Sequence, residues 1–416
     1  MKVVVLGAGV AGVTSAYYLA RDGHEVTVID RQPAAASEAS YGNAGLVAPG
    51  DSYAWASPAA LSMFVNSLFR PDLGIKVRPQ LDPGFFIWCF RFLLQCTGER
   101  ARINTGRKFR IASYARECIN ELIDVTGLAY DGRSAGIVYF YRDQASLDAG
   151  ARHMGLLADL GLAIEVLGRN ELVRREPALA QAGARIAGGI FSPMDQTGDC
   201  CLFTRRLADW CETHARVTFR YATTIRGFES EGRMIKAVAT DKGPVGADAF
   251  VLATGCDSPL IARKLGLSLP ICPVKGYSIT VPVAEGIKGP VFGGVDEDKL
   301  IAYSRLGNRL RLACTAEFAG HDRTHRPADF ARPLAFAREV FPEHIKGGEI
   351  EYWAGLRPMT PSSVPILGPV PGSNLHLNTG HGHVGWTMAC GTAKYVADRL
   401  AGRDPEIDPD GLELQV

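Results

Sequence analysis

Residues 2–30, KVVVLGAGVAGVTSAYYLARDGHEVTVID, decide the fold of this protein. The apolar run at 3–6 is typical of a buried strand, and GAGVAG at 7–12 follows it directly. Residues 13–21 have the apolar spacing of a helix, and 25–29 form a second apolar strand. The order of strand, glycine turn, helix and strand predicts the first unit of a parallel sheet that binds a dinucleotide.

The glycines of this turn have distinct physical roles. Gly7 permits a tight turn, Gly9 lets the backbone approach a pyrophosphate, and Gly12 brings helix and strand close together. The helix N-terminus adds N–H donors and the positive end of its dipole. Asp30, at the end of the second strand, can accept hydrogen bonds from ribose hydroxyls. We expect the dinucleotide to contact Gly7, Gly9, Val10, Ala11, Gly12, Asp30 and Arg31, although the turn alone does not distinguish FAD from NAD.

Composition narrows the possible partners. The chain has 416 residues, which predicts about two or three domains. Its formal net charge of +1 indicates no basic surface for binding nucleic acid.

Its ten cysteines include no C-x-x-C and no zinc-finger spacing, so we expect reduced thiols and no metal site. No signal peptide and no span of roughly twenty apolar residues is evident, which favours a cytoplasmic location.

Two kinds of segment alternate along the chain. The spacing predicts helices near 104–126, 147–160 and 387–400, a strand at 136–141, groups of strands within 218–251 and 273–314, and a long loop at 33–60. We therefore expect an α/β protein with a discontinuous Rossmann-like domain and a second domain built on a mixed β-sheet. The first would comprise 1–80, 195–258 and 355–416, and the second 81–194 and 259–354.

One short apolar segment allows two interpretations. Residues 84–94, GFFIWCFRFLL, are too few to cross a bilayer and contain Arg91. The segment is either a buried helix or an interfacial helix that touches lipid at the inner face of the cell membrane.

Five further segments resemble one family along essentially the whole chain. They are SEASYGNAG at 37–45, DQTGDCCLFT at 195–204, PVKGYSITVP at 273–282, WAGLRPMTP at 353–361 and NTGHGHVGWTMACG at 378–391. Together they resemble the bacterial D-amino acid dehydrogenase small-subunit family, within the D-amino acid oxidase-like FAD oxidoreductases of the glutathione-reductase type. Two departures stand out: Ser362 replaces the family's usual acid after MTP, and His383-Val384 replace its usual Thr-Leu pair.

The resemblance implies FAD as the cofactor and further contacts to it. Val217 falls where the family's strand passes the adenine, and Thr254 ends a segment that returns to the cofactor, although a plain buried strand would look similar. The glycines at 380–385 would let the backbone approach the flavin ring, and the helix after them favours negative charge on reduced flavin. The remaining implied contacts are Ser40, Asn43, Ala44, Gly45, Gly255, Gly355, Gly380, His381, Gly382, His383, Val384, Gly385, Trp386 and Thr387.

Arg357 is the leading candidate for binding the substrate. The family's carboxylate-binding arginine falls on this position, and a guanidinium matches a carboxylate bidentately where lysine cannot. A structural ion pair is the alternative. Tyr277 could bind the same carboxylate or be an ordinary half-buried tyrosine, and Lys275 could stabilise reduced flavin or form a structural salt bridge. His153 and the remaining histidines carry no spacing signal.

The resemblance implies oxidative deamination of an amino acid, with a D-amino acid as the expected substrate. Oxidation at the Cα–N bond would give an imine that hydrolyses to a 2-oxo acid and ammonia, with electrons passed to a quinone or another carrier. Oxidation of a secondary amine, such as a proline derivative or an N-methyl amino acid, remains an alternative. A non-catalytic FAD-binding protein is a second alternative, against which the retention of Arg357 beside GHGHVGW speaks.

Overall fold

The computed structural model describes residues 1–60, 62–63, 74–78, 80–346 and 348–414. The predicted first unit forms the centre of a six-stranded sheet in the order β19-β20-β13-β1-β2-β9. Residues 3–6 of β1 are all buried, as expected for a strand covered on both faces. All neighbours in this sheet are parallel except β19 and β20. Its strands are β1 (Lys2–Leu6), β2 (Glu25–Ile29), β9 (Val217–Arg220), β13 (Ala249–Leu252), β19 (Ile366–Pro369) and β20 (Leu375–Thr379).

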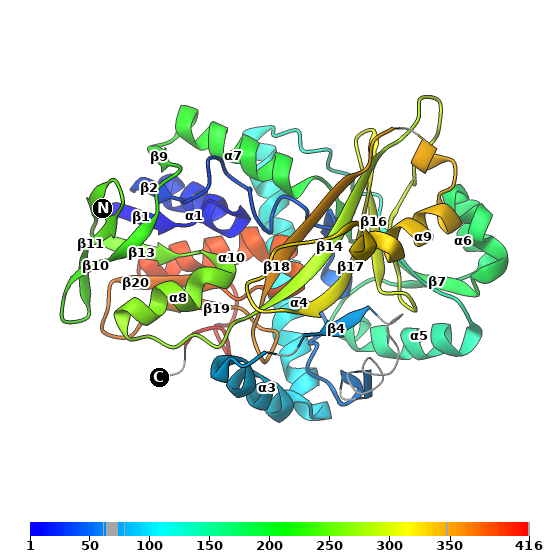
Figure 1. Cartoon of the computed structure of the whole chain (residues 1–416), viewed down its shortest axis with the longest axis horizontal. Helices are drawn as coiled ribbons and strands as arrows, with labels where there is room; N and C mark the ends of the chain where they lie inside the picture. Colours follow the sequence, from blue (N-terminus) through cyan, green and yellow to red (C-terminus); the bar gives the residue numbers. More distant parts are fainter. Residues whose placement is uncertain (61, 64–73, 79, 347, 415–416) are drawn as a thin grey trace.

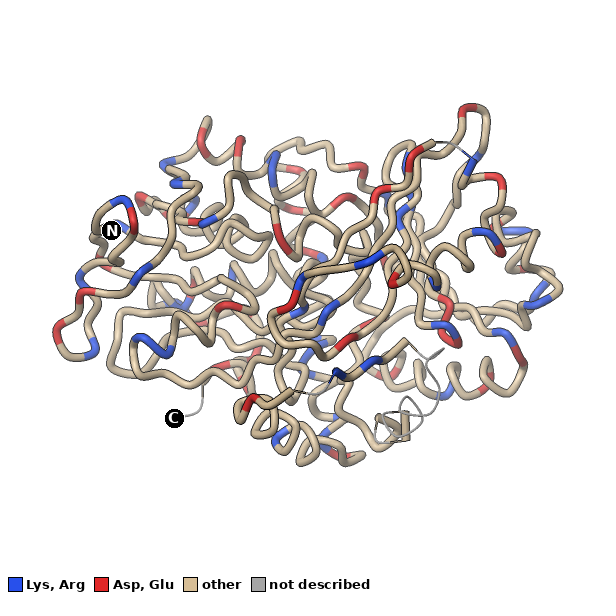
Figure 2. The backbone as a smooth tube through the Cα atoms, viewed as in Figure 1, with Lys and Arg blue, Asp and Glu red and all other residues tan. Residues whose placement is uncertain are grey.

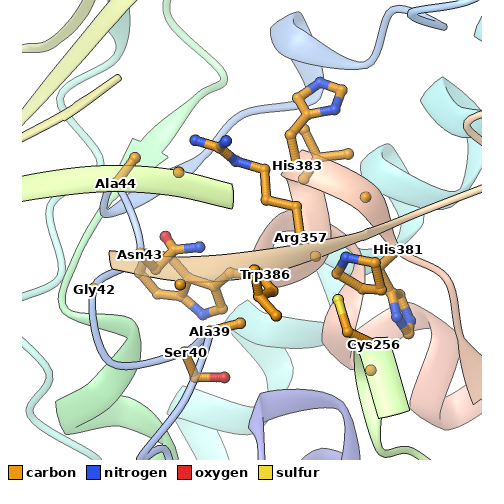
Figure 3. Close-up of a pocket in the computed structure, with 18 of the residues that line it drawn as sticks. Ala39, Ser40, Gly42, Asn43, Ala44, Cys256, Arg357, His381, His383 and Trp386 are labelled. Atoms are coloured by element: carbon orange, nitrogen blue, oxygen red, sulfur yellow. The ribbon is translucent and has the colours of Figure 1, made fainter. Parts of the chain in front are cut away.

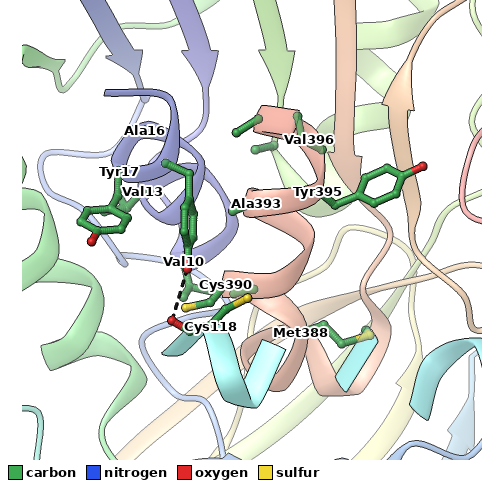
Figure 4. Packing of buried hydrophobic residues seen from close by; sticks show 14 of the residues in the cluster. Val10, Val13, Ala16, Tyr17, Cys118, Met388, Cys390, Ala393, Tyr395 and Val396 are labelled. Atoms are coloured by element: carbon green, nitrogen blue, oxygen red, sulfur yellow. Dashed lines mark hydrogen bonds between the residues drawn. The ribbon is translucent and has the colours of Figure 1, made fainter. Parts of the chain in front are cut away.

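Helices from opposite ends of the chain cover one face of this sheet. Helices α1 (Val10–Arg21) and α10 (Gly385–Leu400) lie side by side, and α4 (Gly98–Thr126) and α7 (Cys200–His214) pack around them (Figures 1 and 4). On the other face, a small antiparallel sheet of β10 (Ile225–Glu231), β11 (Met234–Thr240) and β12 (Gly243–Gly246) packs with α8 (Ser258–Ala262). The cofactor end of the protein is therefore a three-layered domain built from both termini.

A nine-stranded mixed sheet makes up the other half of the molecule (Figure 1). Its main path is β18-β14-β17-β16-β15-β5-β7-β6, and β4 pairs with β17. The strands are β4 (Ile75–Val77), β5 (Ile137–Tyr141), β6 (Glu165–Gly168), β7 (Gly188–Ser192), β14 (Cys272–Pro282), β15 (Gly293–Asp296), β16 (Ile301–Leu306), β17 (Arg309–Phe318) and β18 (Glu351–Met359). Helices α5 (Gln144–Ala158), α6 (Arg169–Arg175) and α9 (Ala331–Val340) accompany it, and β3 (Leu46–Val47) pairs with β8 (Gln196–Thr197) between the two halves.

The helices and strands expected from the sequence are present, but some begin or end at other residues than expected. Helix α4 begins six residues before the expected position 104, where the Thr97 side chain accepts from Arg100 N, and it ends at the left-handed Gly127. The expected loop at 33–60 contains the short β3, a 3-10 turn at Pro49–Asp51 and helical residues at 58–60. Acidic and basic residues are mixed along the chain (Figure 2).

The expected domain division stays a prediction, and three elements do not follow it. Strand β4 lies within the expected 1–80 segment but pairs with the nine-stranded sheet. Helix α4 lies within the expected 81–194 segment but packs against α10, because Ile111, Cys118 and Leu122 form its apolar stripe. Strand β18 spans the expected boundary at 354/355.

Helix α3 (Pro83–Gln95) is not the buried helix that its sequence allowed. Only Trp88 is buried, and its Nε1 donates to Met359 O at 2.9 Å. Phe86, Phe90 and Leu94 have exposed fractions of 58%, 62% and 54%. Across the described ranges, no helix is both long enough and apolar enough to span a bilayer.

The packing of α1 on β1 generates a stability prediction. A Cβ on Gly12 would lie 1.9 Å from Gly7 O, within the backbone of the turn, so Gly12→Ala must separate helix from strand. We expect Gly12→Ala to lower the free energy of unfolding by several kcal/mol, since overpacking of this kind typically costs about 1–3 kcal/mol or more. Gly155→Ala is the matched control, because this glycine is also helical and a Cβ there meets nothing within 4 Å.

Gly155→Ala should leave stability unchanged or raise it by up to about 1 kcal/mol, as alanine favours a helix. Urea unfolding followed by circular dichroism measures both variants. Equal stability of Gly12→Ala and the parent would show that the close approach is not required.

Candidate active site

The glycine turn lies at the carboxyl end of β1, where the nucleotide site was expected. Gly7 has φ +107°, a conformation that favours glycine. Gly9 faces open space, since a Cβ there would meet only the Ser40 hydroxyl, at 3.5 Å. The exposed backbone at Gly9, beside the N-terminus of α1, provides a surface on which a pyrophosphate can lie.

Asp30 closes the far side of the turn. Its Oδ2 accepts from Ala8 N at 2.6 Å and its Oδ1 from Gln32 N at 2.7 Å. Burial raises the pKa of the Asp30 carboxyl, and the two backbone N–H groups oppose that rise. The Arg31 guanidinium is held by Asp257 at 2.6 Å and by Glu38. Asp30 and Arg31 therefore keep fixed positions at the wall where a ribose would bind.

A cavity of about 860 Å³ extends from this turn to the nine-stranded sheet. Figure 3 shows part of its wall, where small residues of the 39–44 loop face Trp386 and Arg357. Most of the expected cofactor contacts line it: Gly7, Gly9, Val10, Ala11, Asp30, Arg31, Ser40, Asn43, Ala44, Thr254, Gly255, Gly355, His381, Gly382, His383, Val384, Gly385, Trp386 and Thr387.

Four expected contacts lie behind the wall instead. Three of them are glycines at positions with no room for a side chain: Gly12, Gly45 and Gly380. A Cβ would lie 1.9 Å from Gly7 O at Gly12, 2.3 Å from Ser304 Oγ at Gly45 and 2.7 Å from Thr360 Cγ2 at Gly380. Val217 is a correction: it pairs with Val26 and packs in the apolar core, while Thr223, Thr224 and Ile225 line the neighbouring wall. An apolar strand residue carries no signal that separates the core from a nucleotide pocket.

The lining fits a flavin dinucleotide. The N-terminus of α1, where Val10 N donates to Ser40 Oγ at 3.0 Å, lies beside a fixed carboxylate and a wall of small residues, a combination that suits a pyrophosphate and a ribose. The Trp386 Nε1 is a buried donor that has no hydrogen-bond partner within the described part of the chain. FAD would be held by these groups, and when bound it supplies the two-electron acceptor.

A β-bulge positions Arg357 at the other end of the cavity. Tyr277 pairs with Cys314 and Lys275 with Glu317, so Thr315 and Ala316 together lie opposite Gly276. Thr315 has φ +66°, which is strained for a β-branched residue, and its carbonyl accepts from Arg357 Nη1 at 2.7 Å.

Gly276 makes the space for this guanidinium. It pairs with Gly355 on β18, and a Cβ at Gly276 would lie 2.5 Å from the Arg357 Cζ, Nη1 and Nη2 atoms. No sequence pattern singles out Gly276 or Thr315, since the bulge depends on how β14 pairs with β17.

The Arg357 charge is enclosed without a carboxylate bound to it. Within the described residues Arg357 forms no ion pair, and burial lowers the pKa of its guanidinium although Cys314 and Asp51 oppose that effect. A half-buried cation of this kind loses part of its hydration, a cost that a bound anion would offset. Figure 3 shows Arg357 and His383 extending into the same part of the cavity. The geometry suits the carboxylate of a ligand.

Tyr277 and Lys275 have structural partners, which corrects their expected roles. The Tyr277 hydroxyl donates to Glu317, which also pairs with Arg78, so it is not directed at a ligand carboxylate. Lys275 is buried and bonds to Thr324 O and Asp322 outside the cavity wall. The structural alternative therefore describes Lys275, whereas Tyr277 is fully buried and lines the cavity with its hydroxyl bonded to Glu317.

Sequence reasoning missed a second group of polar and aromatic residues around the cavity. Asp51, Tyr53 and Trp55 come from the long loop after β3, and Glu297 follows β15. His153, which carried no spacing signal, stacks on Tyr53 with ring centroids 3.9 Å apart. The loop's charged and aromatic tract GDSYAW was the available signal, whereas Glu297 and His153 become neighbours only through the fold.

Three titratable groups meet beside Arg357. Lys108 is fully buried and donates to Tyr53 O, and burial lowers its pKa. Burial raises the pKa of Asp51, although the positive charges of Lys108 and Arg357 oppose that rise. His383 stacks on Trp55 at 5.0 Å, and burial holds its pKa well below the usual value. His383 is therefore neutral at pH 7.

His381 has a supporting role. Its Nε2 lies 3.0 Å from Asn378 Oδ1 and 3.1 Å from Thr392 Oγ1, and burial lowers its pKa to about 4. Within the described ranges, no group of three or more His, Cys, Asp or Glu side chains could hold a metal ion.

Comparisons with known proteins agree with this geometry. The chain matches the model of the FAD-dependent oxidoreductase family over residues 2–399. The chain belongs to the FAD-dependent oxidoreductase family. It is 54% identical over 412 residues to D-amino acid dehydrogenase 2 of Mesorhizobium japonicum, covering 99% of both chains. It is 44% identical over 414 residues to the D-amino acid dehydrogenase of Chromohalobacter salexigens, covering 100% of this chain and 99% of that one.

Solved structures confirm the predicted α/β fold. Glycine oxidase from Geobacillus kaustophilus superposes with a TM-score of 0.76 at 21% identity, over 99% of this chain and 98% of that one. L-proline dehydrogenase from P. horikoshii gives a TM-score of 0.72 at 19% identity, over 97% and 94%. The expected family and the expected cofactor, FAD, are confirmed as well.

The space above Gly276 generates a prediction about Arg357. In Gly276→Ala the new methyl group would displace the guanidinium, the flexible end of a side chain, so the protein should fold and hold FAD. We expect the dissociation constant of a carboxylate ligand such as benzoate to rise roughly tenfold to a hundredfold, as small misplacements of binding groups are costly. Perturbation of the flavin spectrum measures this constant.

Gly227→Ala is the matched control, because this glycine also lies in a strand and a Cβ there meets nothing within 4 Å. Tight benzoate binding by Gly276→Ala, equal to that of the control, would place the ligand carboxylate away from Arg357.

Proposed function

We propose that this protein is an FAD-dependent dehydrogenase that deaminates D-amino acids. The observation that carries the proposal is the enclosed Arg357 guanidinium, which faces a cavity that fits FAD and has no carboxylate bound to it among the described residues. In the reaction, an amino acid, water and an oxidised acceptor give a 2-oxo acid, ammonia and a reduced acceptor. The relatives named D-amino acid dehydrogenase, at 44–54% identity over the full length, support this substrate class.

The residues of the cavity would mainly bind and orient the substrate. Arg357 would hold the carboxylate through two charge-assisted hydrogen bonds, with its position fixed by Thr315 O and Gly276. The substrate amine must be neutral, and it can lose its proton to solvent before it is oxidised. The neutral His383 and the Trp55 ring against it would exclude water and add no positive charge beside the amine.

The two alternatives receive less support. A secondary-amine substrate is favoured by none of the curated relatives described above, and the solved proteins with other substrates are under 25% identical, which shows the fold alone. A non-catalytic role does not explain why a guanidinium is enclosed and left without a carboxylate among the described residues.

Substitution of Arg357 tests the proposed anchor. In Arg357→Lys the charge stays but the two-pronged contact is lost, so the substrate constant for flavin reduction by a D-amino acid should rise about a hundredfold. Arg357→Met should raise it further, because no charge remains. Rapid-reaction measurement against substrate concentration separates weaker binding from slower oxidation. If both variants bind and react like the parent, Arg357 is structural.

We propose further that the reduced flavin passes its electrons to a quinone or another carrier, in place of dioxygen. With a D-amino acid as substrate, reduction of a soluble quinone should exceed hydrogen peroxide formation by at least about tenfold. The two rates are measured side by side in an air-saturated assay. Equal rates would make this protein an oxidase.

We also propose that helix α3 contacts lipid. Trp88 fixes the helix to the body of the protein, while Phe86, Phe90 and Leu94 form part of an exposed apolar face. Exposed apolar helix faces of this kind are typical of interfacial membrane contact. A location at the membrane surface would place the enzyme beside a lipid-dissolved quinone.

Flotation with phosphatidylglycerol vesicles tests the lipid contact. The parent should float with the vesicles, and Phe86→Ser with Phe90→Ser should lose most of that fraction, since each removes apolar area from the contact. Val166→Ser is the control, because Val166 is 57% exposed on strand β6, outside α3. A parent protein that stays at the bottom of the gradient would contradict the proposal.

A further inference from the structure

Glu297 differs from the acidic residues on either side of it in the sequence and from Glu339. Asp296 binds Arg142 at 2.5 Å and Lys299 N at 2.9 Å, and Glu339 binds Arg142 and Lys299. The exposed Asp298 accepts from Arg142 N at 2.5 Å. Within the described residues, the Glu297 carboxylate has neither a hydrogen bond nor an ion pair, although it lines the cavity.

The surroundings of Glu297 favour a cation. The charged groups that act on it are Asp51, Asp296 and Asp298, all acidic, and burial together with these neighbours raises the pKa of Glu297 to about 8. The charge of Asp51 affects the pKa of Arg357 as well as that of Glu297, so Asp51 lies between these two residues along the cavity. A positive charge near Glu297 would relieve both the desolvation and the repulsion.

Aromatic rings complete this part of the wall. Three tyrosines line the cavity close to Glu297, and its charge contributes to raising the pKa of each hydroxyl. They are Tyr53, Tyr139 and Tyr141. The Tyr53 hydroxyl is buried and has no hydrogen-bond partner in the described part of the chain, and its ring stacks on His153. Carboxylates and aromatic faces arranged together are the groups that bind organic cations.

We propose that the cavity selects D-amino acids whose side chain carries a positive charge, with Glu297 binding the terminal cation. This inference rests on the proposed function, because Arg357 must hold the carboxylate at one end. The side chain would then extend past Asp51 and between the tyrosine rings to Glu297. A guanidinium fits this wall well, since it is planar, stacks on aromatic faces and pairs bidentately with a carboxylate.

The test compares D-arginine with D-citrulline, which has nearly the same shape but a neutral urea group. In the parent holoprotein, kcat/KM for dye reduction should be at least about tenfold higher with D-arginine, the effect of a charge-assisted contact. In Glu297→Gln the ratio of the two substrates should fall to about one. Because the ratio is taken within each variant, a change in flavin content does not affect it.

Asp298→Asn is the matched control: it removes the exposed carboxylate of the next residue, whose charge is screened by solvent, so it should keep most of the parent's ratio. A parent ratio of one, or a high ratio that persists in Glu297→Gln, would overturn the assignment of Glu297. If D-alanine reduces the flavin while D-arginine does not, the substrate class is wrong and the proposed function stands. If no D-amino acid reduces the flavin, both fall.

Discussion

The site depends on one constraint: the Arg357 guanidinium lies in the cavity wall, donates a hydrogen bond to the Thr315 carbonyl, and forms no ion pair with a carboxylate among the described residues. Burying an ion without a counter-ion is costly, so the fold must hold Arg357 there against that cost. It does so with local geometry that is itself unfavourable. Thr315 takes a left-handed conformation, and the β14–β17 pairing gives up its regular register at the bulge. Strain of this kind is typically found where a ligand completes the site.

The two halves of the molecule contribute different parts of the same cavity. The six-stranded sheet and helix α1 provide the glycine turn and Asp30, which are rigid because their backbones pack closely. The nine-stranded sheet provides Arg357 and Glu297 from β18 and the end of β15. A cofactor and a substrate are thereby brought together by two sheets that fold around separate cores. Pockets between domains commonly arise in this way.

The sequence predicted what local patterns determine. The glycine turn, the β1–α1–β2 order and the terminal helix follow from short-range spacing, and all are present where expected. Arg357 was identified through resemblance, and it lines the cavity. The sequence could not place Val217, because an apolar side chain suits a core as well as a pocket. It also could not predict the partner of the Tyr277 hydroxyl, which is Glu317, the first paired residue after the bulge on β17. Helix α3 shows the same limit, because an apolar run is compatible with burial and with exposure alike.

Binding of an amino acid by its carboxylate and oxidation of the D-enantiomer can be measured in one experiment. The bound flavin of the parent holoprotein is reduced anaerobically by D-alanine, L-alanine and ethylamine at equal concentrations. D-alanine should bleach the flavin, while L-alanine and ethylamine should react more slowly by at least about a hundredfold; ethylamine lacks the group that Arg357 binds. Bleaching by ethylamine at the rate of D-alanine would contradict binding by the carboxylate.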